Sequence, residues 1–183
     1  MASEIRNKDL WQEGRLKIDW VRHHMPILNS LEEEFRQTLP FKGKKVALSV
    51  HLEAKTAYLC EVLAAGGAEM YVTGSNPLST QDDVAAALVQ AGLNVFAWYD
   101  ATPEEYEAHI RRVLEVGPNI IIDDGGDLVE MLHNKLCLRD MRRKQKHPDD
   151  NTALHNTVLD YRCRNLPYHF KDSLLGAQRI VFR

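Results

Sequence analysis

The sequence predicts an α/β fold, in which a Rossmann-like parallel sheet carries helices on both faces and follows an N-terminal helical pair. Two observations predict this class. Short runs bounded by turns alternate with segments of helix length along residues 46–133, and these runs are apolar throughout rather than alternately polar. Strands of that kind are typical of a parallel sheet that is covered on both faces.

The helical pair is predicted over residues 4–38, where apolar side chains recur at helical spacing with charges between them. Pro26 begins the second helix, over 27–39, and Pro40 ends it. We expect the Glu32, Glu33 and Glu34 run near the middle of this helix to form a solvated face.

The alternating part contains four expected strands, at 46–50, 70–72, 95–98 and 120–122. The helices between and after them are expected at 56–65, 80–91, 103–116 and 128–133. Glycines follow three of these helices, where C-caps are expected. Ligands of such a sheet bind outside the carboxyl ends of its strands, so the strand-to-helix loops are where functional residues are expected.

The loop at 49–56 places a histidine, a carboxylate and an ammonium at the end of the first strand. Histidine is the side chain most readily tuned for proton transfer near neutral pH, which makes His51 a candidate acid/base group. The alternative is an ordinary helix start in which Glu53 and Lys55 are surface charges.

The loop at 74–83 holds more hydrogen-bonding groups than a helix start needs. Ser79 or Thr80 is expected to cap the following helix, and two aspartates in its first turn suit the positive end of the helix dipole. Asn76, Ser79 and Gln81 remain as groups that could hold a sugar or a base.

The loop after the last strand contains the run DDGGD. The adjacent carboxylates of Asp123 and Asp124 repel each other, which can raise the pKa of one of them. Asp127 is expected to cap the last helix. EF-hand spacing is absent, and so are the GxGxxG, GxxxxGK[ST], HExxH and GxSxG motifs, so we assign no metal ligand and no cofactor-binding residue.

The net charge of -3 is an average of two unlike parts. Residues 1–133 carry 12 Lys and Arg against 21 Asp and Glu, whereas 134–183 carry 11 against 5. We therefore predict two parts, a small-molecule-binding α/β domain at 1–133 and a basic C-terminal segment of unknown origin at 134–183. Its basic run, 141–147, could contact phosphates, but a poorly ordered tail or a reading-frame change is favoured over nucleic-acid binding.

The sequence also predicts the cellular compartment of the protein. The chain has 183 residues, and no apolar run in it is long enough for a membrane helix. The N-terminus lacks the apolar core of a secretory signal, and three cysteines at scattered spacings give no disulfide framework. These features predict a cytoplasmic protein without a membrane partner.

The same loops carry a family resemblance. The segment from HLEAKT through NPLSTQDDVAAA, the run IIIDDGGDLVEMLH and the opening GRLKIDWVRHHMPILNSLEEEF resemble S-adenosyl-L-homocysteine hydrolase. The similarity covers about residues 9–133 and the N-terminal substrate-binding part of that family. HLEAKT looks like the form found in an archaeal and thermophilic-bacterial branch.

In that family a bound NAD oxidises the ribose 3′-hydroxyl, which acidifies the 4′ proton and allows homocysteine to leave. Water then adds, and the reduced cofactor restores the hydroxyl. The resemblance implies that His51 and Asp124 are catalytic acid/base groups. It also places Thr56, Ser79 and Gln81 at positions that line or support the nucleoside site.

One departure concerns the base pocket. Many members read HxTxET, with the Thr and Glu contacting adenine, whereas Glu53 and Lys55 occupy those places here. We count both among the substrate-binding candidates, and S-inosylhomocysteine is a substrate hypothesis beside S-adenosylhomocysteine.

A second departure follows the matched part. An EETTTG motif, a Lys and Asp pair and a Rossmann NAD domain are expected next and are not in the sequence. We therefore expect a truncated form whose NAD-binding domain is missing and which has no turnover by itself. The expected partners are a nucleoside or nucleosyl-homocysteine ligand, and a second copy or a full-length relative. The alternative is a non-catalytic nucleoside-binding or interaction protein.

Overall fold

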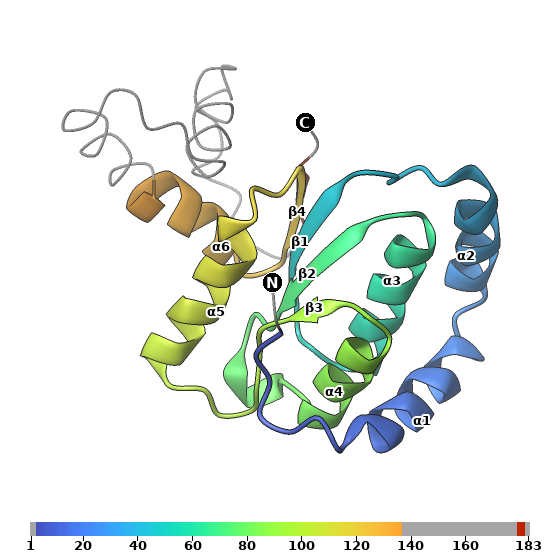
Figure 1. Cartoon of the computed structure of the whole chain (residues 1–183), viewed down its shortest axis with the longest axis horizontal. Coiled ribbons are helices and arrows are strands. Elements are labelled where there is room, and N and C mark those ends of the chain that lie inside the picture. The colour runs from blue at the N-terminus through green and yellow to red at the C-terminus, as the bar shows by residue number, and fades with distance from the viewer. Residues whose placement is uncertain (1–2, 137–178, 182–183) are drawn as a thin grey trace.

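The computed structural model describes residues 3–136 and 179–181, and Figure 1 shows their arrangement. A five-stranded sheet has the order β3-β2-β1-β4-β5. Its strands are β1 (Lys45–Ser49), β2 (Glu69–Thr73), β3 (Asn94–Val95), β4 (Ile120–Asp123) and β5 (Arg179–Val181). The first four run parallel, which confirms the predicted α/β class.

The register of the parallel strands brings three strand ends together. Ser49 at the end of β1 aligns with Thr73 of β2 on one side and with Asp123 of β4 on the other. The loops that follow these residues therefore leave the sheet at one edge. This edge is where ligands of parallel sheets bind.

The sheet is not wholly parallel, which the sequence pattern did not predict. β5 pairs antiparallel with β4, with Ile122 opposite Ile180. β5 thus adds a short strand to the parallel sheet beside its edge strand β4. The sequence does not predict this strand, because no crossover pattern of helix length in the sequence points to it.

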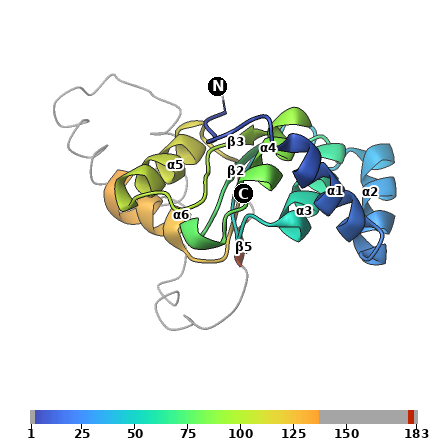
Figure 2. The same ribbon diagram turned by 90° about the horizontal axis from the view of Figure 1, so that it is seen from below.

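Helices cover both faces of the sheet (Figures 1 and 2). The helices are α1 (Trp11–Arg22), α2 (Pro26–Thr38), α3 (Ala54–Ala65), the 3₁₀ helix η1 (Pro77–Ser79), α4 (Asp82–Gln90), α5 (Pro103–Glu115), α6 (Asp127–Glu130) and the π-helical η2 (Met131–Leu136). α3 and α4 lie on one face with α1 and α2 outside them, and α5 and α6 lie on the other. The predicted N-terminal helical pair is confirmed.

The two faces have separate cores. One cluster packs α1, α3 and α4 against the sheet around Ile18, Leu48 and Leu88. The other packs α5 and α6 against the opposite face around Phe96, Leu114 and Leu128. The sheet that carries the candidate site is thus held rigidly from both sides.

α1 approaches α4 very closely at Gly14. A Cβ atom built on Gly14 would lie 1.9 Å from the carbonyl oxygen of Asp83, where no heavy atom fits. The glycine thus permits a backbone approach that brings the next turn of α1 beside the loop before α4.

One sequence expectation about the helical pair is wrong. Glu32 is 6% exposed and pairs with Arg22 and Arg36, so only Glu33 and Glu34 of the acidic run lie on a solvated face. Two apolar side chains of α1 are exposed, namely Leu16 at 71% and Trp20 at 65%.

Among the described residues no helix is long and apolar enough to cross a membrane. Cys60 is a free, buried thiol. Cys137, Cys163 and the basic run 141–147 lie outside the described residues.

Candidate functional site

The three polar loops are tied together by their backbones. The N–H of Ser75 donates to the carbonyl oxygen of Val50 at 3.2 Å, and the N–H of Asp124 donates to that of Ser49 at 3.1 Å. A third bond runs from the N–H of Gln81 to the carbonyl oxygen of Leu52 at 3.0 Å. The loops after β1, β2 and β4 therefore form one unit at the carboxyl edge of the sheet.

His51 joins the first loop to the second through a side-chain contact. Its Nδ1 lies 2.5 Å from Oγ of Ser79, and that hydroxyl lies 3.0 Å from the carbonyl oxygen of Asn76. The Ser79 hydroxyl has one proton, so when it donates to the Asn76 carbonyl its oxygen accepts from Nδ1 of His51. In the neutral imidazole this leaves Nε2 with a free lone pair.

Asn76 has a structural use that the sequence did not assign to it. Its side-chain oxygen accepts from the N–H of Leu78 at 2.9 Å and caps η1, while Thr80 Oγ1 donates to its carbonyl oxygen at 3.1 Å. α4 has no side-chain cap, so the predicted capping role of Ser79 or Thr80 is wrong. The side-chain cap, from Asn76, instead lies on η1, the short 3₁₀ helix that precedes α4.

A groove of about 550 Å³ lies between α1 and the start of α3. Three predicted substrate-binding residues line it, namely Glu53, Lys55 and Gln81. Lys55 and Glu53 lie 3.5 Å apart and keep side-chain exposures of 66% and 40%. The surface-charge interpretation thus describes their exposure, but the two side chains also form the wall of a cavity.

Asp124 lies in the loop after β4, at the same edge as His51. The residue is half-buried, and its Oδ1 is buried without a hydrogen-bond partner among the described residues. A buried carboxylate oxygen without a donor is costly, so this atom is a candidate acceptor for a hydrogen bond from a ligand.

Asp123, not Asp127, supports the start of α6. One Asp123 oxygen accepts from the N–H of Gly126 at 3.0 Å and the other from that of Val129 at 3.1 Å. The predicted cap at Asp127 is wrong, because this carboxylate instead lies 2.7 Å from the hydroxyl of Tyr106.

The pKa of the Asp123 carboxyl is raised, chiefly by burial, against the opposing effect of the N–H groups of Val129 and Gly126. The charge of Asp127 adds to the rise. A raised pKa within the aspartate run is confirmed, but repulsion from Asp124 is not its cause.

Replacing Asp123 with asparagine is expected to lower the free energy of unfolding by about 2 kcal/mol, since an amide cannot accept both N–H bonds. The raised pKa means that the folded state holds the Asp123 proton more tightly than the unfolded state. The wild type therefore gains stability relative to Asp123→Asn as pH falls toward the ordinary value of 3.8. Urea unfolding of both proteins between neutral pH and 4 checks this, and a gap that narrows on acidification contradicts it.

The structure separates the remaining candidates. Thr56 is buried in the first turn of α3 and does not line the groove. Leu16, Lys17 and Trp20 of α1 do line it, although no functional role was predicted for them. The exposure of Leu16 and Trp20 could not be read from helical spacing alone.

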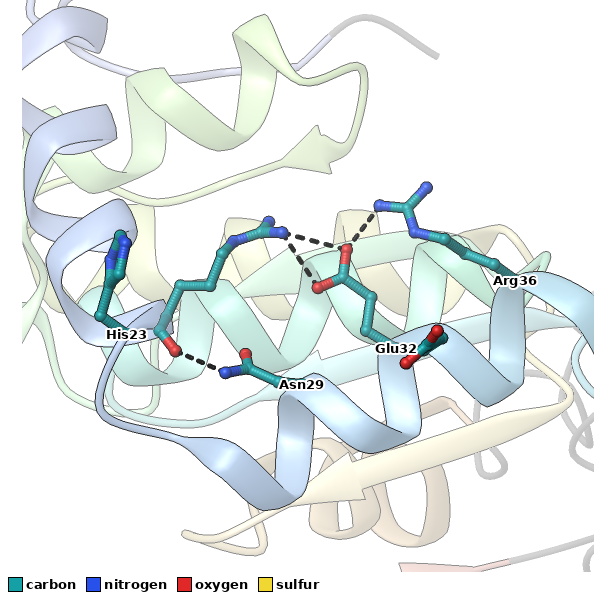
Figure 3. Close-up of a pocket in the computed structure, with 6 residues that line it drawn as sticks. His23, Asn29, Glu32 and Arg36 are labelled. Carbon is teal, nitrogen blue, oxygen red and sulfur yellow. Dashed lines mark hydrogen bonds and ion pairs between the residues drawn. The ribbon is translucent and has the colours of Figure 1, made fainter.

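A second cavity, of about 470 Å³, opens between α1 and α2 (Figure 3). Arg22 and Arg36 both pair with Glu32 there. Arg22 also reaches Glu61 of α3 at 2.9 Å. Because these charges compensate one another within the protein, the cavity is a structural ion-pair network rather than a ligand site.

The described residues do not fit the cofactor that the resemblance implies. The loop after β1 contains no glycine to cradle a pyrophosphate. The glycine pair after β4 stands among the carboxylates of Asp123, Asp124 and Asp127, and a Cβ on Gly125 would lie 3.0 Å from Oδ2 of Asp127. No group of three or more His, Cys, Asp or Glu in this part of the chain is arranged to hold a metal ion.

Fold and site together define a class: an α/β domain with a parallel sheet and a candidate ligand site in the loops at the carboxyl edge of that sheet. Residues 2–176 match the family described as S-adenosyl-L-homocysteine hydrolase. The chain belongs to this family. The match runs beyond residue 133, so it is wider than the resemblance noted in the sequence.

Individual relatives support this family assignment. The chain is 52% identical over 132 residues to the S-inosyl-L-homocysteine hydrolase of Methanocaldococcus jannaschii, covering 72% of this chain and 32% of that protein. It is 48% identical over 133 residues to the S-inosyl-L-homocysteine hydrolase of Methanococcus maripaludis, with coverage of 73% and 32%. An adenosylhomocysteinase of Pyrococcus abyssi is 47% identical over 131 residues, with coverage of 72% and 31%. The match thus spans about a third of the length of these relatives.

Proposed function

We propose that the carboxyl edge of the sheet binds the nucleoside of a nucleosyl-homocysteine and that His51 and Asp124 are its acid/base groups. The observation that carries this proposal is the contact between His51 and Ser79. It joins two loops that the resemblance assigns to the nucleoside site, and it orients the imidazole ring.

The role of His51 follows from that contact. With Nδ1 donating to Ser79, the neutral ring has its lone pair on Nε2, which can take a proton from a bound ligand. Ser79 is in turn held by the carbonyl of Asn76. A base oriented in this way needs no rearrangement when the ligand binds.

Asp124 supplies the complementary group. Its unpartnered Oδ1 is an acceptor for a ribose hydroxyl, and the backbone bond to Ser49 holds the residue beside the end of β1. His51 and Asp124 therefore follow neighbouring strands and serve one ligand.

The reaction implied by the family needs an oxidant as well as these groups. NAD supplies the hydride chemistry when bound, and the sequence contains no GxGxxG loop that would cradle it. We therefore assign nucleoside binding and proton handling to these 183 residues by themselves, and no complete turnover.

We also propose that the preferred nucleoside is inosine rather than adenosine. The HLEAKT loop places Lys55 where many members have the glutamate that contacts adenine, and the structure puts Lys55 in the groove wall. Two of the relatives described above carry the name S-inosyl-L-homocysteine hydrolase.

Isothermal titration of the purified 183-residue chain with inosine tests the site. We expect saturable binding that His51→Ala and Ser79→Ala each weaken by about tenfold, the loss of roughly one hydrogen bond. His23→Ala is the matched control, since His23 is an exposed histidine whose Nδ1 contacts only the nearby backbone. With NAD and S-inosylhomocysteine added, no homocysteine is expected.

Absence of binding would remove the proposal and favour an interaction protein. Homocysteine release by the purified chain would instead overturn the assignment of binding without turnover.

A further inference from the structure

α1 contributes one wall of the groove that holds Glu53 and Gln81. Leu16 and Trp20 form its apolar part, and Lys17 between them forms its polar part. Neither His51 nor Ser79 lines this groove, but two residues of the lining, Glu53 and Gln81, each lie two residues along the chain from one member of that contacting pair.

Lys17 fixes the orientation of the Gln81 side chain. Its Nζ lies 3.1 Å from Oε1 of Gln81 and 2.7 Å from Oδ2 of Asp83. An ammonium group can only donate hydrogen bonds, so the oxygen of the Gln81 amide must face Lys17. The amide nitrogen, a donor, is then the group that Gln81 can offer to a ligand.

The position of Lys17 is itself determined by the packing of α1 on α4. Gly14 allows the two backbones to meet at Asp83, and the Asp83 carboxylate, whose side chain is 11% exposed, holds the lysine. Lys17 is therefore placed by a charge-assisted contact and not by the ligand.

The polar lining of the groove consists mostly of donors. Lys17, Lys55 and the Gln81 amide nitrogen all donate, while Glu53 is the acceptor and lies 3.5 Å from Lys55. Such a lining favours a ligand edge that carries an acceptor. At position 6 a purine carries either a carbonyl oxygen, which accepts, or an amino group, which donates.

We propose that Lys17 is a positioning residue for base selection: by holding the oxygen of Gln81, it turns the amide N–H toward the groove and selects a 6-oxopurine over a 6-aminopurine. This inference rests on the proposed nucleoside site. It assigns the choice between the two bases to α1 and α4 as well as to the HLEAKT loop.

Titration of the full 183-residue chain with inosine and with adenosine gives the ratio of the two dissociation constants. Lys17→Met frees the amide to rotate and is expected to lower the preference for inosine by about fivefold, the worth of one hydrogen bond. Lys17→Arg, which also only donates, is expected to retain the preference. Gln81→Glu presents a carboxylate instead of an N–H and is expected to shift the ratio toward adenosine.

Lys44→Met, at an exposed lysine remote from the groove lining, is the matched control and should leave the ratio unchanged. If Lys17→Met leaves the ratio unchanged while His51→Ala still weakens inosine binding, the role of Lys17 is overturned and the proposed nucleoside site is not. If the wild type binds neither nucleoside, the proposed function fails and this inference fails with it. If Lys17 had only a structural role, Lys17→Met would weaken the binding of both nucleosides equally. That result would also contradict the proposal.

Discussion

Replacing Gly14 with alanine is expected to lower the free energy of unfolding by about 3 kcal/mol, at the upper end of the usual effect of overpacking. The added Cβ would lie 1.9 Å from the carbonyl oxygen of Asp83 and 2.8 Å from the nitrogen of Val84, both backbone atoms that cannot rotate away. α1 and α4 must therefore separate. Chemical denaturation with urea measures the loss.

The sign of this effect is diagnostic. At an exposed position inside a helix, a change from glycine to alanine stabilises by about 1 kcal/mol. Gln12→Ala, on the exposed side of the same helix, is the matched control and is expected to change stability by less than about 0.5 kcal/mol. A Gly14→Ala protein as stable as the wild type would show that α1 does not meet α4 as described.

Removing the Glu32 side chain is expected to have an effect of similar size. Its carboxylate pairs with Arg22 and Arg36 (Figure 3). It also accepts from the hydroxyl of Tyr58 at 2.9 Å. Glu32→Ala removes the anion from the largely buried part of this ion-pair network. The free energy of unfolding is expected to fall by about 3 kcal/mol. Glu33→Ala changes the next glutamate, which is exposed and lines the same cavity, and should cost little.

The pH dependence of stability distinguishes Glu32→Ala from Glu33→Ala further. Burial would raise the pKa of Glu32, but hydrogen bonds from Arg36 and Tyr58 and the charges of Arg22 and Arg36 outweigh it and hold the pKa below 4.5. The stabilisation is therefore present above the pKa of the unfolded state and is lost as pH falls through the folded value. The advantage of the wild type over Glu32→Ala should shrink on acidification, and an unchanged gap would contradict the ion-pair account.

Much of the fold could be predicted because it depends on local patterns. The apolar runs around Val46, Met70 and Ile120 became strands, and their continuous apolar character correctly indicated a covered parallel sheet. β5 could not be predicted, because pairing at a sheet edge depends on which distant segment reaches it. The burial of Glu32 was missed for the same reason: its neutralising cations come partly from another helix.

For the candidate site, the location of the residues could be predicted from the sequence, but their contacts could not. Strand-end loops pointed to His51 and Asp124, and the structure places both at one edge. The contact of His51 with Ser79 joins loops that are 28 residues apart, which spacing cannot show. Lys17 was missed because a lysine within an amphipathic helix looks like any solvated charge.

Nuclear magnetic resonance of the isotopically labelled 183-residue chain, titrated with inosine, tests the nucleoside site most directly. We predict saturable shifts of backbone amides in the three loops, at His51, Ser79 and Asp124 and their neighbours, with no change at amides around Glu32. Saturable shifts confined to the cavity between α1 and α2, or no shifts at all, would contradict it.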